Sequence, residues 1–285
     1  MHQHLLRTFA VTLLLVTLML ATASAAQAEA VPTKLPAGFV RLGEIAPHIL
    51  EDMRYATPRN FTGNPVPGYR SGRCILARPA AEALARVNAA VAEYGYALKV
   101  YDCYRPARAV RSFVRWAKSQ QADQATKFYY PRIPRSEIIS RGYVAEHSSH
   151  SRGIAVDLTL VRIDGVAAQQ STAPDKKNAK SDGPPQASCL DTCRETTTTK
   201  TTTTGARPGL PAPTLPASVD MGTAWDCFDI KSHTQSSTIG PAARENRALL
   251  VRAMTAQGFR NYHREWWHFS WPARGFQQAH DFIVD

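Results

Sequence analysis

Residues 146–159 read E-H-S-S-H-S-R-G-I-A-V-D-L-T, and they join a polar segment to an apolar run. The β-branched residues within 154–163 predict a buried strand. A turn at Gly153 leads into this strand, so we expect His150 and Asp157 to lie together at one edge of the sheet. This stretch therefore predicts a buried strand with a functional site at its beginning.

Hydrophobic periodicity places further helices and strands around this strand. Three segments have apolar residues at helical spacing, and each begins next to a proline: 79–94, 105–117 and 241–257. Shorter strand-like segments are 39–42, 53–55, 97–101, 259–262 and 266–271. The mixture predicts one α+β domain, with a central, mainly antiparallel sheet and helices packed against it.

The first residues are typical of a secretory signal peptide. Basic and polar residues precede an apolar run at 9–21, and the small residues A-S-A-A-Q-A follow at 23–28. A transmembrane anchor is the alternative, but the run is short for a bilayer. We therefore expect a signal peptide at 1–28, cut after Ala28 or after Ala25. The mature protein is then periplasmic or secreted, with no stable membrane insertion.

The chain of 285 residues carries a formal net charge of +11. A basic surface can attract nucleic acid, anionic lipid or an acidic cell-wall polymer. Export argues against nucleic acid as a partner, and the sequence has no lysine run or RNA-binding signature. We interpret the charge as a dispersed, solvated surface.

Composition changes abruptly at residues 164–217. This segment contains Gly-Pro-Pro, a threonine tract at 196–204 and Pro-Ala-Pro, with few large apolar residues. Such a stretch buries too little apolar surface to offset its conformational entropy. We predict a disordered insertion within a single domain that spans residues 29–285. A glycosylated or wall-spanning spacer is the alternative.

Two motifs point to a metal-dependent hydrolase. A zinc hydrolase needs three protein ligands, an open position for water and a base. His150 and Asp157 offer two ligands, while E-W-W-H at 265–268 offers His268 as the third and Glu265 as the base. Either motif alone is weak support. Together, each attached to an apolar strand, they favour a zinc site in a cleft at the sheet edge.

Five separated motifs carry a resemblance to a known family. They are S-x-H-x-x-G-x-A-x-D at 148–157, E-W-W-H at 265–268, R-Y-A-T-x-x-N-F-T-G at 54–63, Y-D-x-Y-R-P at 101–106 and M-G-T-x-x-D at 221–226. Together they resemble the D-alanyl-D-alanine dipeptidases, the VanX-type branch of the zinc D-Ala-D-Ala peptidases. The resemblance covers most of residues 38–285 and leaves out the segment at 164–217.

This resemblance implies zinc-dependent hydrolysis of the small dipeptide D-Ala-D-Ala to two D-alanines, with one zinc ion per chain. The site residues that it implies are the zinc ligands His150, Asp157 and His268, the general base Glu265, the oxyanion-stabilising Arg105, and the substrate-binding Asp226, Ser148 and Tyr55. A carboxylate in the pocket suits a free amino terminus, which must be paired once it is desolvated. Asp102 and His233 lie in matching segments, and we expect them to contact site residues rather than the substrate.

Two other functions stay open. A D,D- or L,D-carboxypeptidase that acts on longer peptidoglycan stem peptides shares the metal site. It needs an open cleft and no partner for a substrate ammonium, so Asp226 argues against it. A non-catalytic module that binds cell-wall peptide or zinc predicts the loss of the base or of a ligand, and the sequence keeps all of these residues.

Five cysteines in an exported protein predict disulfides with one thiol left over. Cys103 and Cys227 lie in the segments D-C-Y and D-C-F, which both belong to the motifs assigned to the site. We therefore favour a Cys103–Cys227 disulfide. No pair of cysteines has the C-x-x-C spacing of a structural zinc site.

Overall fold

The run that follows Gly153 forms β5 (Ala155–Arg162), the middle strand of a five-stranded sheet. Every residue of β5 except the last is buried. In the sheet order β2-β4-β5-β7-β6, its neighbours are β4 (Tyr96–Asp102) and β7 (His268–Ser270). The outer strands are β2 (Leu50–Glu51) and β6 (Arg260–Asn261). β2 pairs in parallel with β4, and the other three pairings are antiparallel. The expected α+β class is therefore confirmed, with a mixed and mainly antiparallel sheet.

The computed structural model describes residues 34–119, 126–164, 189–190, 215–272 and 275–285. The predicted signal peptide at 1–28 and most of the predicted insertion at 164–217 lie outside these ranges. Residues Pro36 to Asp285 belong to one compact unit. Within the described ranges, no helix has the length and apolar character that a membrane span requires.

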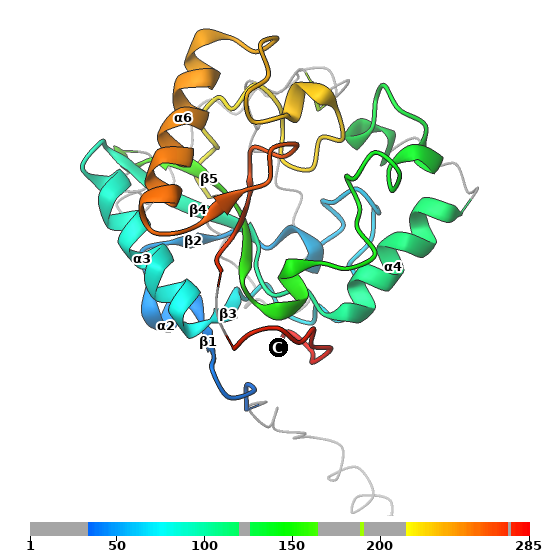
Figure 1. The fold of residues 1–285 in the computed structure, drawn as a ribbon, viewed down its shortest axis with the longest axis horizontal. Coiled ribbons are helices and arrows are strands. Elements are labelled where there is room, and N and C mark those ends of the chain that lie inside the picture. Colours follow the sequence, from blue (N-terminus) through cyan, green and yellow to red (C-terminus); the bar gives the residue numbers. More distant parts are fainter. Residues whose placement is uncertain (1–33, 120–125, 165–188, 191–214, 273–274) are drawn as a thin grey trace, which may run out of the picture. The chain divides into compact units, whose positions relative to one another are not determined.

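Helices flank the sheet on two sides (Figure 1). α3 (Arg78–Ala92) and α6 (Pro241–Ala256) pack against each other, while α4 (Ala107–Lys118) lies on the opposite flank in this view. Proline stands in the first turn of α3 and of α6, where its missing N–H costs no hydrogen bond. A short helix, α2 (Leu42–Ile45), follows β1 (Phe39–Arg41), which pairs with β3 (Ile75–Ala77) in a separate two-stranded sheet.

One predicted strand is wrong. Residues 53–55 do not form a strand. The chain there enters the 3₁₀ turn η1 (Arg54–Ala56), in which Ala56 N donates to Met53 O and Thr57 N donates to Arg54 O. Met53 and Tyr55 are both buried, so this stretch alternates like a strand. The stretch is too short for that alternation to distinguish a strand from a turn.

The predicted Cys103–Cys227 disulfide is also wrong. Cys103 is bonded to Cys74, and Cys227 is bonded to Cys189. Tyr104 N donates to Ile75 O at 2.8 Å, so the chain after Cys103 runs beside the chain after Cys74. Two segments can belong to one site without their cysteines being close enough to bond. A disulfide forms only where the local backbone brings the two sulfur atoms together. The fifth cysteine, Cys193, lies outside the described residues.

Two described parts of the predicted insertion are packed against the domain. Cys189 is fully buried, and the carbonyl of Pro216 accepts a hydrogen bond from the buried Lys99 Nζ at 2.8 Å. Val219 N then donates to Leu160 O at 3.0 Å, which starts the return of the chain to the sheet.

Gly153 provides a test of how the turn before β5 is built. Its φ is +68°, and a Cβ there would lie 2.3 Å from Phe39 Cε1. Gly153→Ala should lower the free energy of unfolding by about 1–2 kcal/mol because of left-handed backbone strain. Overpacking against Phe39 should lower it by about 1–3 kcal/mol more. Urea unfolding measures the sum.

Gly95→Ala is the matched control, because φ is +81° and no atom lies within 4 Å of its added Cβ. It should show the strain alone. Equal losses in the two variants would contradict the packing argument at Gly153.

Candidate active site

Three side chains from three elements converge at the beginning of β5. His150 comes from the 3₁₀ turn η4 (Ser149–Arg152), Asp157 from β5 and His268 from β7. Ser148 caps η4 by accepting a hydrogen bond from His150 N at 3.2 Å. Asp157 and His268 face each other as antiparallel partners on adjacent strands. The site therefore lies on the middle strands of the sheet rather than on an outer strand.

The three donor atoms are nearly equidistant. Asp157 Oδ1 lies 3.2 Å from His150 Nε2 and 3.1 Å from His268 Nδ1, and the two nitrogens are 3.1 Å apart. Ligands bound to zinc at about 2.0–2.1 Å in a tetrahedron stand about 3.3 Å from one another. The spacing thus matches three ligands of one tetrahedral metal ion.

The hydrogen bonds behind these ligands orient their lone pairs. His150 Nδ1 contacts Cys103 O at 2.7 Å. A carbonyl oxygen can only accept, so Nδ1 carries the proton and Nε2 is left as a ligand atom. Burial, assisted by the charges of His150 and Arg105 and opposed by Asp157, lowers the pKa of His268. Neutral imidazoles are the form that binds a metal, so the donor set fits a cation.

Asp157 is the charged centre of this group. Burial opposes its ionisation, but His150 and His268 outweigh that effect and hold its pKa well below the usual range. Arg105 Nη2 also lies 3.6 Å from Asp157 Oδ2.

Arg105 lies just before α4 and is held in place by several contacts. Its Nε and Nη2 both lie 2.9 Å from Asp102 Oδ2, and its guanidinium stacks on the rings of Tyr55 and Phe113. Asp102 is fully buried, accepts from Tyr69 Oη at 2.6 Å and lies 3.3 Å from His150 Nδ1. It therefore contacts site residues, as the sequence predicts. An arginine has five N–H donors, so Arg105 keeps donors beyond those that face Asp102.

Glu265 and Asp226 are buried carboxyl groups that line the same cavity as the cluster. Glu265 Oε2 lies 3.9 Å from His268 Nδ1. Burial first, and then the charges of Asp157 and Asp226, raise the pKa of Glu265 well above the usual range. Burial and Asp157 likewise raise the pKa of Asp226, which accepts a hydrogen bond from Tyr55 Oη at 2.8 Å. Carboxyl groups with raised pKa values suit proton transfer near neutral pH.

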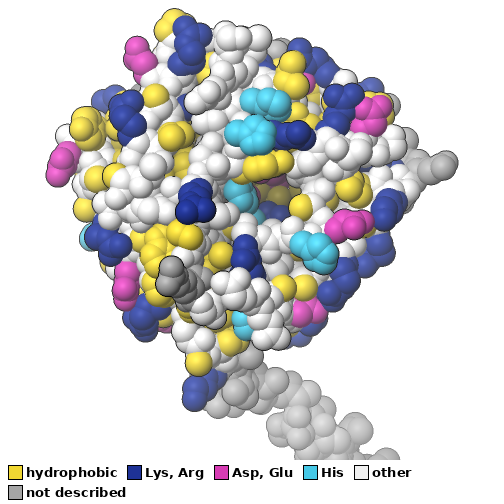
Figure 2. All heavy atoms as spheres, viewed as in Figure 1, with side chains coloured by type: hydrophobic (Ala, Val, Ile, Leu, Met, Phe, Trp, Pro, Cys, Tyr) yellow, Lys and Arg dark blue, Asp and Glu magenta, His cyan; other side chains and the backbone are white. Residues whose placement is uncertain are grey.

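The three potential ligands, together with Arg105, Glu265 and Asp226, line one cavity of about 260 Å³. Figure 2 shows a hollow on the viewed face, with histidine and basic side chains around it. The eight site residues expected from the sequence all line the cavity: Tyr55, Arg105, Ser148, His150, Asp157, Asp226, Glu265 and His268. The structure thus brings them together, and their chemical roles stay predictions.

The aromatic walls of the cavity were not expected from the sequence. These are Phe61, Phe113, Tyr143 and Tyr262. Phe61 lies inside the motif at 54–63 and Tyr262 stands three residues before Glu265, so motif proximity was the available signal. His147 lines the cavity as well, whereas His233 and His263 contact each other, with ring centroids 6.4 Å apart. His233 is thus not among the residues that line the cavity, and its predicted contact with site residues is indirect at most.

A family model described as D-ala-D-ala dipeptidase matches residues 36–168 and 163–285. The chain belongs to that family. It is 34% identical over 232 residues to a D-alanyl-D-alanine dipeptidase of Enterococcus faecalis, covering 81% of this chain and 90% of that protein. Similar proteins of the same name from Streptomyces coelicolor and Escherichia coli are 32% and 27% identical, covering 90% and 84% of their lengths. The dipeptidase is therefore a metallopeptidase, and His150, Asp157 and His268 are the group of potential ligands that its described residues provide.

Metal content tests this group directly. His150→Ala should lower metal affinity by more than about 100-fold, because substitution of a residue that only supports a ligand already lowers metal affinity by about 10- to 100-fold. Atomic emission on the dialysed protein measures the bound metal. Glu265→Gln is the control and should keep a full complement. Full metal content in His150→Ala would place the metal elsewhere.

Proposed function

We propose that this dipeptidase uses one zinc ion, held by His150, Asp157 and His268, to hydrolyse D-Ala-D-Ala to two D-alanines. The observation that carries the proposal is the convergence of three ligand atoms, 3.1–3.2 Å apart, beside a buried glutamate in a small cavity. The names of the relatives support the substrate.

Zinc is favoured by the chemistry of the donor set. Two imidazoles and one carboxylate are a common three-ligand set for catalytic zinc, which leaves a further position open. When bound, zinc supplies a Lewis acid that lowers the pKa of a water molecule and polarises the scissile carbonyl.

The protein's own residues carry the proton and charge transfers. The Glu265 carboxylate accepts a proton from the attacking water and passes it to the nitrogen of the leaving D-alanine. Arg105 donates hydrogen bonds to the oxygen of the scissile carbonyl as negative charge develops there. Its contacts with Asp102 keep the guanidinium fixed, so little reorganisation accompanies that step.

Substrate selection follows from Asp226 and from the size of the cavity. Asp226 is buried, and an ammonium group gives its carboxylate a partner. Tyr55 holds the carboxylate through its hydrogen bond to Oδ2, while Ser148 borders the same cavity. A volume of about 260 Å³ is below the range of drug-sized pockets, so a dipeptide suits it better than a longer peptide.

The test is D-alanine release from D-Ala-D-Ala and from a pentapeptide that ends in D-Ala-D-Ala. We expect cleavage of the dipeptide, loss on chelation and recovery with zinc, with the pentapeptide at least about 100-fold slower. Glu265→Gln should lower kcat by about 100- to 10,000-fold. Comparable cleavage of the pentapeptide would indicate a carboxypeptidase, and no cleavage of either by the zinc-loaded protein would remove the proposal.

We also propose that the protein is exported to the periplasm or beyond the cell. The signal-like sequence at 1–28 supports this, as do the two disulfides, which persist in oxidising compartments. Mass spectrometry of the mature protein should give an N-terminus at Glu29, or at Ala26. An intact N-terminus in a membrane fraction would indicate an anchor instead.

A further inference from the structure

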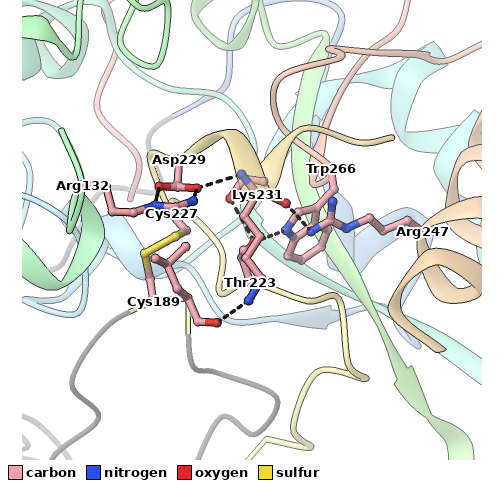
Figure 3. The surroundings of a disulfide bond; sticks show 10 residues. Arg132, Cys189, Thr223, Cys227, Asp229, Lys231, Arg247 and Trp266 are labelled. Atoms are coloured by element: carbon pink, nitrogen blue, oxygen red, sulfur yellow. Dashed lines mark hydrogen bonds and ion pairs between the residues drawn. A yellow bond between two sulfur atoms is a disulfide. The ribbon is translucent and has the colours of Figure 1, made fainter. Parts of the chain in front are cut away.

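Asp226 lies in a segment, residues 221–233, that we call the Asp226 loop. Asp226 has a φ of 59°, a left-handed conformation that a residue other than glycine keeps only when its surroundings hold it there. The hydrogen bond from Tyr55 restrains the carboxylate itself. The position of the backbone depends on how the loop is attached, and Figure 3 shows attachments on two sides.

One side of the loop is attached to the part of the chain that carries Glu265. Arg247 is 1% exposed, and it donates to three carbonyls of the loop, those of Met221, Lys231 and His233, at 2.7, 3.2 and 2.7 Å. Trp266, the residue after Glu265, donates from Nε1 to Thr223 Oγ1 at 2.9 Å (Figure 3). These contacts hold both ends of the loop but none of them reaches residues 224–230.

The other side is attached to residues 189–190, which belong to the segment predicted as an insertion. Cys189 is bonded to Cys227, the residue next to Asp226 (Figure 3). Its carbonyl accepts from Ala224 N at 3.0 Å. Leu190 O accepts from Lys231 Nζ at 2.9 Å. The insertion therefore contacts the loop at Ala224, at Cys227 and at Lys231, which lies in the 3₁₀ turn η5 (Ile230–Ser232).

Cys189 is itself anchored to the wall of the domain. Its N–H donates to Phe128 O at 3.2 Å, and the adjacent Tyr129 O accepts from Phe228 N of the loop at 2.7 Å. Arg132 Nε donates to Asp229 Oδ2 at 2.6 Å. The disulfide thus ties the middle of the loop to a support that is hydrogen-bonded independently of it.

We propose that Cys189, through its disulfide with Cys227, is a positioning residue for Asp226 and thereby sets the affinity for the substrate ammonium. The inference rests on the proposed function, because it assigns Asp226 to that ammonium. A covalent bond one residue away limits how far the left-handed backbone at Asp226 relaxes when the pocket is empty. The segment at 164–217 then contributes to the site rather than serving only as a spacer.

The test replaces Cys189 and Cys227 by serine in a parent that already carries Cys193→Ser, so that no other thiol can pair. KM for D-Ala-D-Ala should rise about tenfold, roughly the effect of weakening one charge-assisted hydrogen bond, with kcat nearly unchanged. The preference for D-Ala-D-Ala over N-acetyl-D-Ala-D-Ala should narrow by a similar factor, since the acetylated substrate has no ammonium. A merely structural role leaves that preference unchanged.

Asp226→Asn supplies the second arm of the experiment. Made in the parent, it should raise KM at least as much and remove most of the preference for the free ammonium. The two serines should then add little further in this variant, because both changes act on one interaction. Fully additive effects, or an unchanged KM in the disulfide variant, overturn the positioning role. If the parent itself does not cleave D-Ala-D-Ala, the proposed function fails instead.

Lys231→Met provides a test if the disulfide variant does not fold. It keeps both disulfides and removes the hydrogen bond from Lys231 Nζ to Leu190 O. KM should rise by about two- to threefold with a matching loss of preference, as expected for a single exposed or half-buried hydrogen bond. No change in KM and preference in this variant then counts against the role of residues 189–190.

Discussion

The ionised carboxylate of Asp157 is the constraint on which the site depends. It lies on a buried strand, where an unpaired charge is strongly unfavourable. The guanidinium of Arg105 at 3.6 Å offsets part of that cost, and a cation bound by Asp157 and the histidine nitrogens at 3.1 and 3.2 Å would offset more. These groups come from the segment just before α4, from η4 and from β7. The contacts that Asp157 makes therefore tie η4, β7 and the segment before α4 to β5.

Three carboxyl groups in one cavity end up with different proton affinities. Histidine contacts keep the pKa of Asp157 low, while burial and the charge of Asp157 keep those of Glu265 and Asp226 high. The separation suits the first group to metal binding and leaves the other two responsive to protons or to a cationic partner. The same residue types acquire separate roles because their surroundings differ.

The Asp226 loop shows how support is divided in this protein. Arg247 satisfies three backbone carbonyls at the ends of the loop, and burial lowers its pKa to about 9. The insertion, through Cys189, supports the middle. Arg247 has no described carboxylate in hydrogen-bond contact, so its three carbonyl contacts must offset much of the cost of burying its charge.

The sequence by itself determined the elements and the membership of the site. The apolar run at 154–163, the prolines before the helices and five spaced motifs were enough, since they depend on local spacing; all eight expected site residues line one cavity. The structure alone decided the strand order, the turn at 54–56, the pairing Cys74–Cys103 and Cys189–Cys227, and the aromatic walls. Those features depend on which distant backbone segments lie side by side in space, and residue spacing along the chain gives no information on that.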